Sequence, residues 1–275
     1  MRKTNRTRLV RRLVQLGFAT FILVAAVRHS LGSEHLPSTD AFCPFGAVET
    51  LWQLASTGTF VSKTHPSNLL VGIGLLLGAL LVGPSFCGWI CPFGALNDLL
   101  TWIRKRLRLP EVRVPGRLDR VLTLGRYVTL VGILYATIAT ATLWFADYDP
   151  YRTIFSLSWL FEFNWLEHWP AYVIALSVIA GGLLIPRFWC RYLCPQSAIL
   201  SLLQRISPLK VRRNAATCVD CKRCDRACPT RLNVSTTEAV KGNCIGCLEC
   251  VDACPVQDTL TVNLGRPKAE VKEGM

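Results

Sequence analysis

Residues 218–229 read CVDCKRCDRACP, and residues 244–255 read CIGCLECVDACP. Both stretches follow the pattern C-x-x-C-x-x-C-x-x-x-C-P, in which the first three thiolates bind one iron-sulfur cluster and the fourth binds the neighbouring cluster. We therefore predict two [4Fe-4S] clusters with crossed ligand sets. Cluster I takes Cys218, Cys221, Cys224 and Cys254, and cluster II takes Cys244, Cys247, Cys250 and Cys228. Paired zinc sites are the alternative, but zinc needs neither the third cysteine of each run nor the trailing C-P.

A second pair of cysteine motifs lies upstream, FCGWICPFGALNDLLTW from Phe86 and FWCRYLCPQSAILSL from Phe188. Both contain C-x-x-x-C-P-x-x-A, which indicates an internal repeat of about 103 residues. On a helix, cysteines four positions apart share one face, so two such pairs could supply the four thiolates of a third metal or cluster site. A redox-active dithiol and simple packing at helix ends are the alternatives. The residues concerned are Cys87, Cys91, Cys190 and Cys194.

The composition indicates a membrane protein, since 51% of the residues are hydrophobic and the mean hydropathy is +0.33. A secretory signal is the alternative for the first apolar stretch, but no small-residue cleavage site follows it cleanly. We predict an α-helical membrane bundle of four transmembrane helices in two duplicated hairpins, followed by a small α+β ferredoxin-like domain with two clusters. The predicted spans are Leu13–Val27, Leu69–Phe86, Tyr127–Phe145 and Ala171–Ile185.

The charge distribution predicts the orientation of these spans. Of the 31 Lys and Arg residues, 27 lie on one side of the predicted bundle and three on the other. Because cytoplasmic loops carry the excess of basic residues, we expect both termini in the cytoplasm and the protein in the inner (cytoplasmic) membrane. The net charge of +13 is then a topology signal, and we expect no nucleic-acid partner. The predicted units are a transmembrane domain (1–213), a cytoplasmic 2[4Fe-4S] domain (214–264) and a flexible tail (265–275).

These motifs, in this order, resemble the NapH-type membrane ferredoxins, a family of quinol dehydrogenase subunits with relatives among NosR-type and methylamine-utilisation proteins. The resemblance implies electron transfer between the quinone pool and a redox partner such as a ferredoxin-type or cytochrome subunit, in a respiratory reductase pathway. It therefore implies quinol as a substrate and membrane lipid as the surroundings. An assembly factor that supplies electrons to a metal centre of a respiratory enzyme is the alternative. A membrane sensor is a third class, but the predicted outer loops leave little room for an input domain.

Several polar residues fall in or beside the predicted outer loops. His65, His168 and Glu167 are placed for proton handling beside a quinol, although solvated loop polarity explains them as well. Cys43 begins CPFGAV, which repeats the CPFGAL that begins at Cys91. We expect this segment to be a membrane-surface helix on the outer side, with Cys43 as a structural residue.

Overall fold

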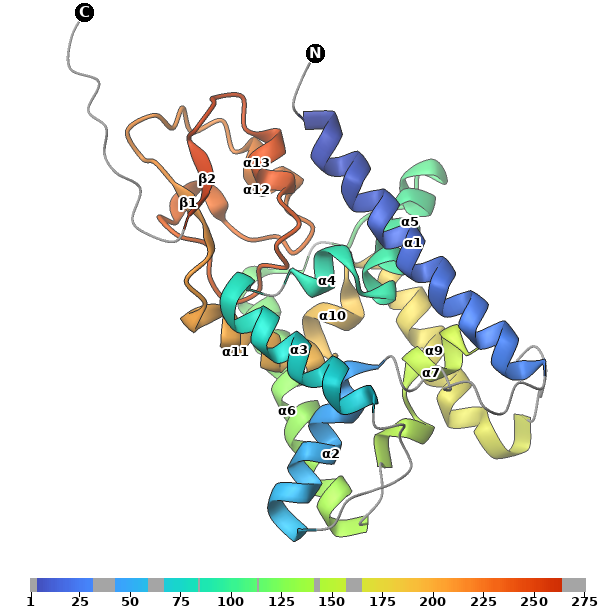
Figure 1. Cartoon of the computed structure of the whole chain (residues 1–275). Coiled ribbons are helices and arrows are strands. Elements are labelled where there is room, and N and C mark those ends of the chain that lie inside the picture. Colours follow the sequence, from blue (N-terminus) through green and yellow to red (C-terminus); the bar gives the residue numbers. More distant parts are fainter. Residues whose placement is uncertain are drawn as a thin grey trace, which may run out of the picture.

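The structure is a computed structural model that describes residues 4–31, 43–58, 67–83, 85–112, 114–140, 144–156 and 165–263. The described residues form a mainly helical protein with a two-stranded sheet, as Figure 1 shows. In chain order the elements are α1 (Thr4–Ser30), α2 (Pro44–Thr57), α3 (Ser67–Val82), α4 (Phe86–Trp89), α5 (Pro92–Arg106), α6 (Gly116–Thr140), η2 (Trp144–Asp147), α7 (Pro150–Phe155), α9 (Trp165–Leu184), α10 (Phe188–Tyr192), α11 (Pro195–Ile206), β1 (Lys210–Arg213), α12 (Arg223–Ala227), η3 (Val234–Thr236), α13 (Glu249–Ala253) and β2 (Leu260–Asn263).

The helices form two interlocked repeats, α1 to α5 and α6 to α11. In each repeat the last helix packs across the molecule, so α5 contacts α1 and α9, while α11 contacts α6 and α3. The short second helix follows the same rule: α2 contacts α3 and α6, and α7 contacts α9 and α1. Equivalent helices of the two repeats therefore make equivalent contacts, as in a pseudo-twofold arrangement. Each repeat is therefore longer than the predicted hairpin, because it includes the short helix that precedes the apolar one.

Each of the four predicted spans overlaps a described helix, although α6 ends at Thr140, before the predicted Phe145, and two of these helices satisfy the length and composition of a membrane crossing. These are Thr7–His29 in α1 and Gly116–Thr140 in α6. The other two are shorter apolar stretches, Leu70–Val82 and His168–Leu184. Helix α3 ends before the predicted Phe86 because Gly83 takes a left-handed φ of 77°.

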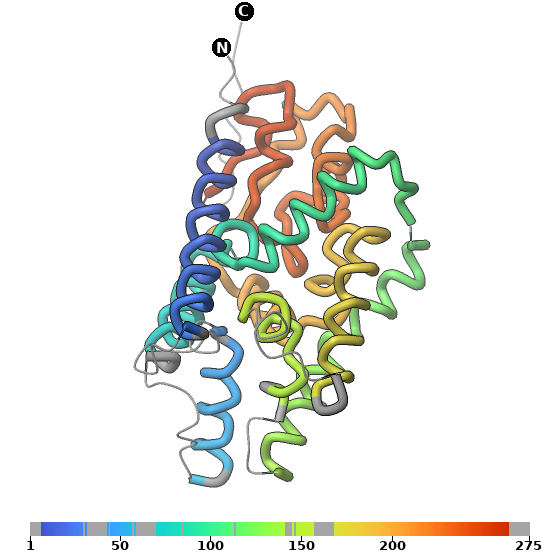
Figure 2. The backbone as a smooth tube through the Cα atoms, turned by 90° about the vertical axis from the view of Figure 1, so that its right-hand side faces the viewer, coloured from blue at the N-terminus to red at the C-terminus, as the bar shows by residue number. Residues whose placement is uncertain are grey.

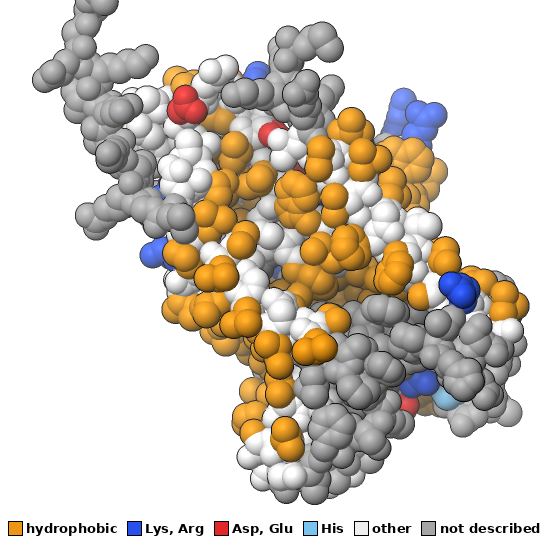
Figure 3. Space-filling view, in the orientation of Figure 1, with side chains coloured by type: hydrophobic (Ala, Val, Ile, Leu, Met, Phe, Trp, Pro, Cys, Tyr) orange, Lys and Arg blue, Asp and Glu red, His pale blue; other side chains and the backbone are white. Residues whose placement is uncertain are grey.

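The outer faces of these helices are apolar. Large hydrophobic side chains are exposed on α1, α3 and α6, and hydrophobic atoms cover the middle of the face in Figure 3. Exposed apolar surface of this extent marks a membrane or protein contact rather than a water-facing surface. On these helices it fits a lipid-facing belt.

Each C-x-x-x-C-P motif breaks its helix instead of continuing it. Cys91 precedes Pro92 and takes an extended conformation (φ −61°, ψ 124°), so α4 ends before it and α5 begins after it. Cys194 does the same before α11 (φ −65°, ψ 116°). The reason is steric, since a residue that precedes proline is pushed out of the helical region. The expectation that both cysteines of a motif share one helix face is therefore wrong, and a sharp turn brings them together instead.

The C-terminal unit is a small α+β fold at one end of the molecule. Strands β1 and β2 pair antiparallel, with Val211 opposite Val262, so the unit begins at β1. Its core combines apolar residues with cysteines, including Val234, Cys224 and Cys250. Figures 1 and 2 both place this unit beside the N-terminal end of α1, while α2 lies at the opposite end of the molecule.

Candidate iron-sulfur centres

The cysteines of the C-terminal unit lie in two groups, each with three cysteines from one run and one from the other. One group lines a small pocket of about 360 Å³ and consists of Cys218, Cys221, Cys224 and Cys254. In the other group, Cys228 lies within electrostatic reach of Cys244 and Cys250, with Cys247 beside them. Helices α12 and α13 pack together, which brings the fourth cysteine of each run next to the other run.

Burial controls the chemistry of these thiols. It raises the pKa of Cys244 to about 11 and the pKa of Cys247 to about 12, with backbone hydrogen bonds acting in the opposite direction. Without metal these buried thiols are therefore protonated at neutral pH. Iron binds thiolates, so loading of this group releases protons.

A second set of cysteines meets in the helical part, in a pocket of about 630 Å³ that we call the central pocket. All four cysteines of the C-x-x-x-C-P motifs line it, and so does Cys43. The thiols of the two repeats are close enough to interact electrostatically. Cys87 and Cys194 each interact with both Cys91 and Cys190. Within the described residues, three or more His, Cys, Asp or Glu side chains nowhere come close enough to hold one metal ion, and this applies to the C-terminal cysteines as well.

Four helix starts converge on the central pocket. The residue before the first turn is Cys43 for α2, Cys91 for α5, Asp149 for α7 and Cys194 for α11. In every case it is extended and proline follows it, because proline is well suited to the first helical position. The three cysteines make no side-chain hydrogen bond to their helices. Their sulfurs are therefore not engaged in capping.

The position of Cys43 corrects the expectation of an outer surface helix. Helix α2 packs against α3 and α6 and buries Glu49 and Gln53, and Cys43 at its start lies 3.6 Å (Sγ to Oδ2) from Asp149. The signal available in the sequence was the repeated X-Pro element, which recurs at Asp149-Pro150.

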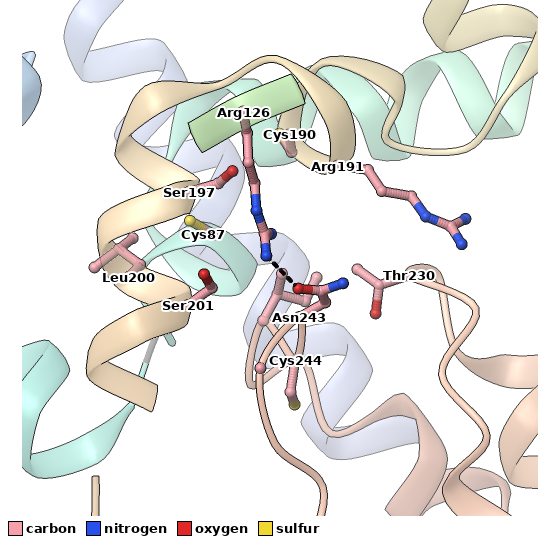
Figure 4. Close-up of a pocket in the computed structure, with 12 residues that line it drawn as sticks. Cys87, Arg126, Cys190, Arg191, Ser197, Leu200, Ser201, Thr230, Asn243 and Cys244 are labelled. Carbon is pink, nitrogen blue, oxygen red and sulfur yellow. Dashed lines mark hydrogen bonds between the residues drawn. The ribbon is translucent and has the colours of Figure 1, made fainter. Parts of the chain in front are cut away.

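The central pocket and the C-terminal unit are in direct contact. The carbonyl oxygen of Ile245 lies so close to Gly88 that a Cβ there would be 2.5 Å away, and Trp89 Nε1 donates to the Gly246 carbonyl at 2.9 Å. A smaller pocket of about 420 Å³ lies between the two parts, shown in Figure 4, and is lined by Cys87, Cys190 and Cys244 among others. A hydrogen bond of 2.6 Å from Arg126 to Asn243 crosses it.

Arg187 is the charged residue at this junction. Its side chain is 1% exposed, and it lies within electrostatic reach of Cys87, Cys190 and Cys247. Its Nη2 donates to Asp98 at 2.9 Å, but its Nε and Nη1 have no hydrogen-bond partner among the described residues. A buried guanidinium with free donors costs free energy unless an anion satisfies them. An iron-sulfur cluster held by thiolates is such an anion.

Of the three predicted proton-handling residues, only His168 has a described side chain, and it does not line the central pocket. His168 is exposed on α9. His65 lies outside the described residues, and so does the side chain of Glu167.

Comparison with known families supports the cluster chemistry of both regions. A 4Fe-4S binding domain family matches twice, at residues 64–110 and 167–214, which contain the C-x-x-x-C-P motif of each repeat. A 4Fe-4S dicluster domain family matches residues 210–255. The double match confirms the predicted internal repeat.

Among curated proteins, the chain is 32% identical over 238 residues to YccM of Escherichia coli (strain K12), whose name assigns it to electron transport, covering 85% of this chain and 66% of YccM. It is 28% identical over 178 residues to the ferredoxin-type protein NapH of Haemophilus influenzae, covering 63% of this chain and 58% of NapH. The chain belongs to the ferredoxin-type membrane proteins with 4Fe-4S domains. The matched families indicate that the chain binds 4Fe-4S clusters.

The chain spans only part of the length of the curated relatives it matches. It spans about two thirds of YccM, and it covers only 24% of NirI of Paracoccus denitrificans, to which it is 34% identical over 168 residues. No solved structure matches the chain.

Proposed function

We propose that this chain passes electrons between the quinone pool and a redox partner protein of ferredoxin or cytochrome type, as the quinol dehydrogenase subunit of a respiratory reductase pathway. Iron-sulfur clusters, when bound, supply one-electron redox centres. The observation that carries the proposal is that three groups of cysteines follow one another in space. This series begins in the central pocket, continues across the contact at Gly88 to the group of Cys244, and ends at the group of Cys218 near the surface.

In this proposal the central pocket holds a third four-thiolate centre. Its residues fit an anionic cluster for two independent reasons. The amino-terminal ends of α5 and α11 carry positive partial charge and point their capping cysteines into the pocket. The buried Nε and Nη1 of Arg187, which lies within electrostatic reach of Cys87 and Cys190, lack partners among the described residues. Four cysteines from two repeats in one pocket favour this centre over a dithiol or simple helix packing.

We further propose that the bundle crosses the inner membrane four times with both termini in the cytoplasm. In support, the start of α1 and the C-terminal unit lie at one end of the molecule, and the end of α2 at Gly58 lies at the other. Alkaline phosphatase fused at Gly58 should therefore be active, and the same fusion at Gly274 should be inactive. Phosphatase activity at Gly274 would overturn this orientation.

The central experiment combines iron and sulfide counting with redox-titrated EPR on the purified full chain. Three clusters correspond to about twelve iron atoms per chain, and two clusters to about eight. Cys190→Ser should lower the count by about four and abolish reduction of the C-terminal clusters by quinol, while dithionite still reduces them. Cys221→Ser is the matched control, because it should remove a C-terminal signal and leave the central one. A Cys190→Ser protein that keeps the native iron content and quinol-linked rate contradicts the proposal.

A further inference from the structure

The central pocket is nearly symmetric, and two of its departures from symmetry introduce a carboxylate and an amide. Most lining residues occur in matched pairs from the two repeats, such as Cys87 with Cys190 and Phe86 with Trp189. The first exception is that Cys43 of one repeat corresponds to Asp149 of the other. The second is at the residue after the capping Cys-Pro, which is Phe93 in α5 and Gln196 in α11. Four matched thiols suffice for a cluster, so the departures require a different explanation.

Gln196 has the properties of a ligand-binding residue. It lines the central pocket, and its side chain is 7% exposed. Neither its Nε2 nor its Oε1 has a hydrogen-bond partner among the described residues. A buried amide that lacks both a donor and an acceptor partner is costly, which indicates a bound molecule that offers both.

The walls of the pocket define the class of that molecule. Phe45, Phe145, Tyr151 and Trp189 all line it, and Phe45 meets Phe145 edge to face at 5.7 Å between ring centroids. The polar groups on these walls are few. They are Gln196, the Asp149–Cys43 pair, and the hydroxyls of Tyr151 and Ser197, of which the Ser197 hydroxyl donates to the Cys194 carbonyl. An apolar aromatic pocket with a small number of placed polar groups is typical of a site for a flat organic ring.

We propose that the aromatic side of the central pocket binds the head group of a quinone or quinol, with Gln196 and Asp149 as its polar contacts. The Gln196 Nε2 donates to a quinone carbonyl. A quinol hydroxyl donates to Gln196 Oε1 or to the Asp149 carboxylate. This assignment rests on the proposed function, and it places the lipid-soluble substrate beside the four thiols instead of at the outer loops with His65 and His168.

The test is photolabelling of the full, cluster-loaded chain in lipid nanodiscs with an azido-ubiquinone, with decylubiquinone as competitor and peptide mapping by mass spectrometry. We expect label on the segments that begin at Cys43, Asp149 and Pro195. Gln196→Leu should raise the half-saturating concentration about tenfold or more, because it removes both amide groups at nearly constant volume. Asp149→Asn should have a smaller effect. Gln53→Leu is the matched control, since it makes the same change at a buried glutamine of α2 that does not line the pocket.

The outcomes separate this assignment from the proposed function. Label that maps to other segments, or unchanged binding by Gln196→Leu, overturns the assignment even if quinol still reduces the clusters. A failure of any quinone to label the protein or reduce its clusters overturns the quinone part of the proposed function as well. Selective labelling that Gln196→Leu weakens and Gln53→Leu leaves unchanged supports the assignment.

Discussion

The C-terminal unit and the central pocket both gather cysteines, but by different means. In the C-terminal unit, three cysteines of each group come from one short run, and the helices between them, α12 and α13, have five residues each. In the central pocket, the cysteines come from two motifs about a hundred residues apart in the sequence, each at the start of a helix, α5 or α11. The packing of these helices against others holds the cysteines in place. A group built from a short run has little structure to define it before metal binds, whereas the central pocket is defined by helix packing.

The largest expected effect is that of removing iron, which should act on the two regions differently. Because thiols contribute to the core around Val234 and metal binding is coupled to folding in such small units, the C-terminal unit should lose its fold when iron is chelated under reducing conditions. Trypsin should then cleave rapidly within 210–241, while the helical circular dichroism signal falls only slightly. Equal protection of the unit with and without iron would remove the distinction between the two regions.

The second prediction concerns the crossed groups within the C-terminal unit. Cys228→Ser should disturb the same EPR signal as Cys244→Ser, and Cys254→Ser should disturb the same signal as Cys218→Ser, each with a loss of about four iron atoms. The reason is the packing of α12 on α13, which places each fourth cysteine with the other run. If Cys228→Ser and Cys218→Ser affect one common signal, the groups are not crossed.

The same contrast explains what could be predicted from the sequence. The spacing of cysteines predicted the C-terminal groups, because nearby residues in a tight run have few ways to arrange themselves. Hydropathy predicted the positions of the apolar helices. The position of Cys43, which the start of α2 brings to the central pocket, could not be predicted this way. It depends on the packing of α2 against α3 and α6. Arg187 and Gln196 were missed for a similar reason, because only burial and unmet hydrogen bonds distinguish them.

The third prediction concerns a substitution that weakens the contact between the two regions without changing a cysteine. Gly88→Ala would place a Cβ 2.5 Å from the Ile245 carbonyl oxygen, so the loop of Cys244 must move away. Overpacking of this kind costs about 1–3 kcal/mol, which lowers the equilibrium constant for docking by roughly fivefold to 150-fold. Amide hydrogen exchange in residues 242–248 should accelerate accordingly, with the iron content unchanged. Gly74→Ala on α3 is the control, because nothing lies within 4 Å of its added Cβ, and equal exchange in both variants would show that the contact is not tight.

The smallest expected effect is a shift in redox potential on replacing Arg187. Its buried charge acts on Cys87 and Cys190 of the central pocket and on Cys247 of the C-terminal unit. A nearby positive charge favours the more negative, reduced form of a cluster, so Arg187→Met should lower the midpoint potential. The expected size is tens of millivolts, on the order of the 59 mV that corresponds to a tenfold change in a one-electron equilibrium. Arg187→Lys should preserve much of the potential, since it keeps the charge but loses the planar donors.

EPR-monitored titration measures this shift for each cluster separately, and the pattern carries more information than its size. Because Arg187 faces cysteines of both regions, the central signal and the signal of the Cys247 group should move together, while the group of Cys218 should move least. Arg205→Met, the same loss of charge at the exposed end of α11, is the control and should shift every signal less. A shift confined to one cluster would assign Arg187 to that region alone, and the two regions would then be electrostatically independent despite their contact.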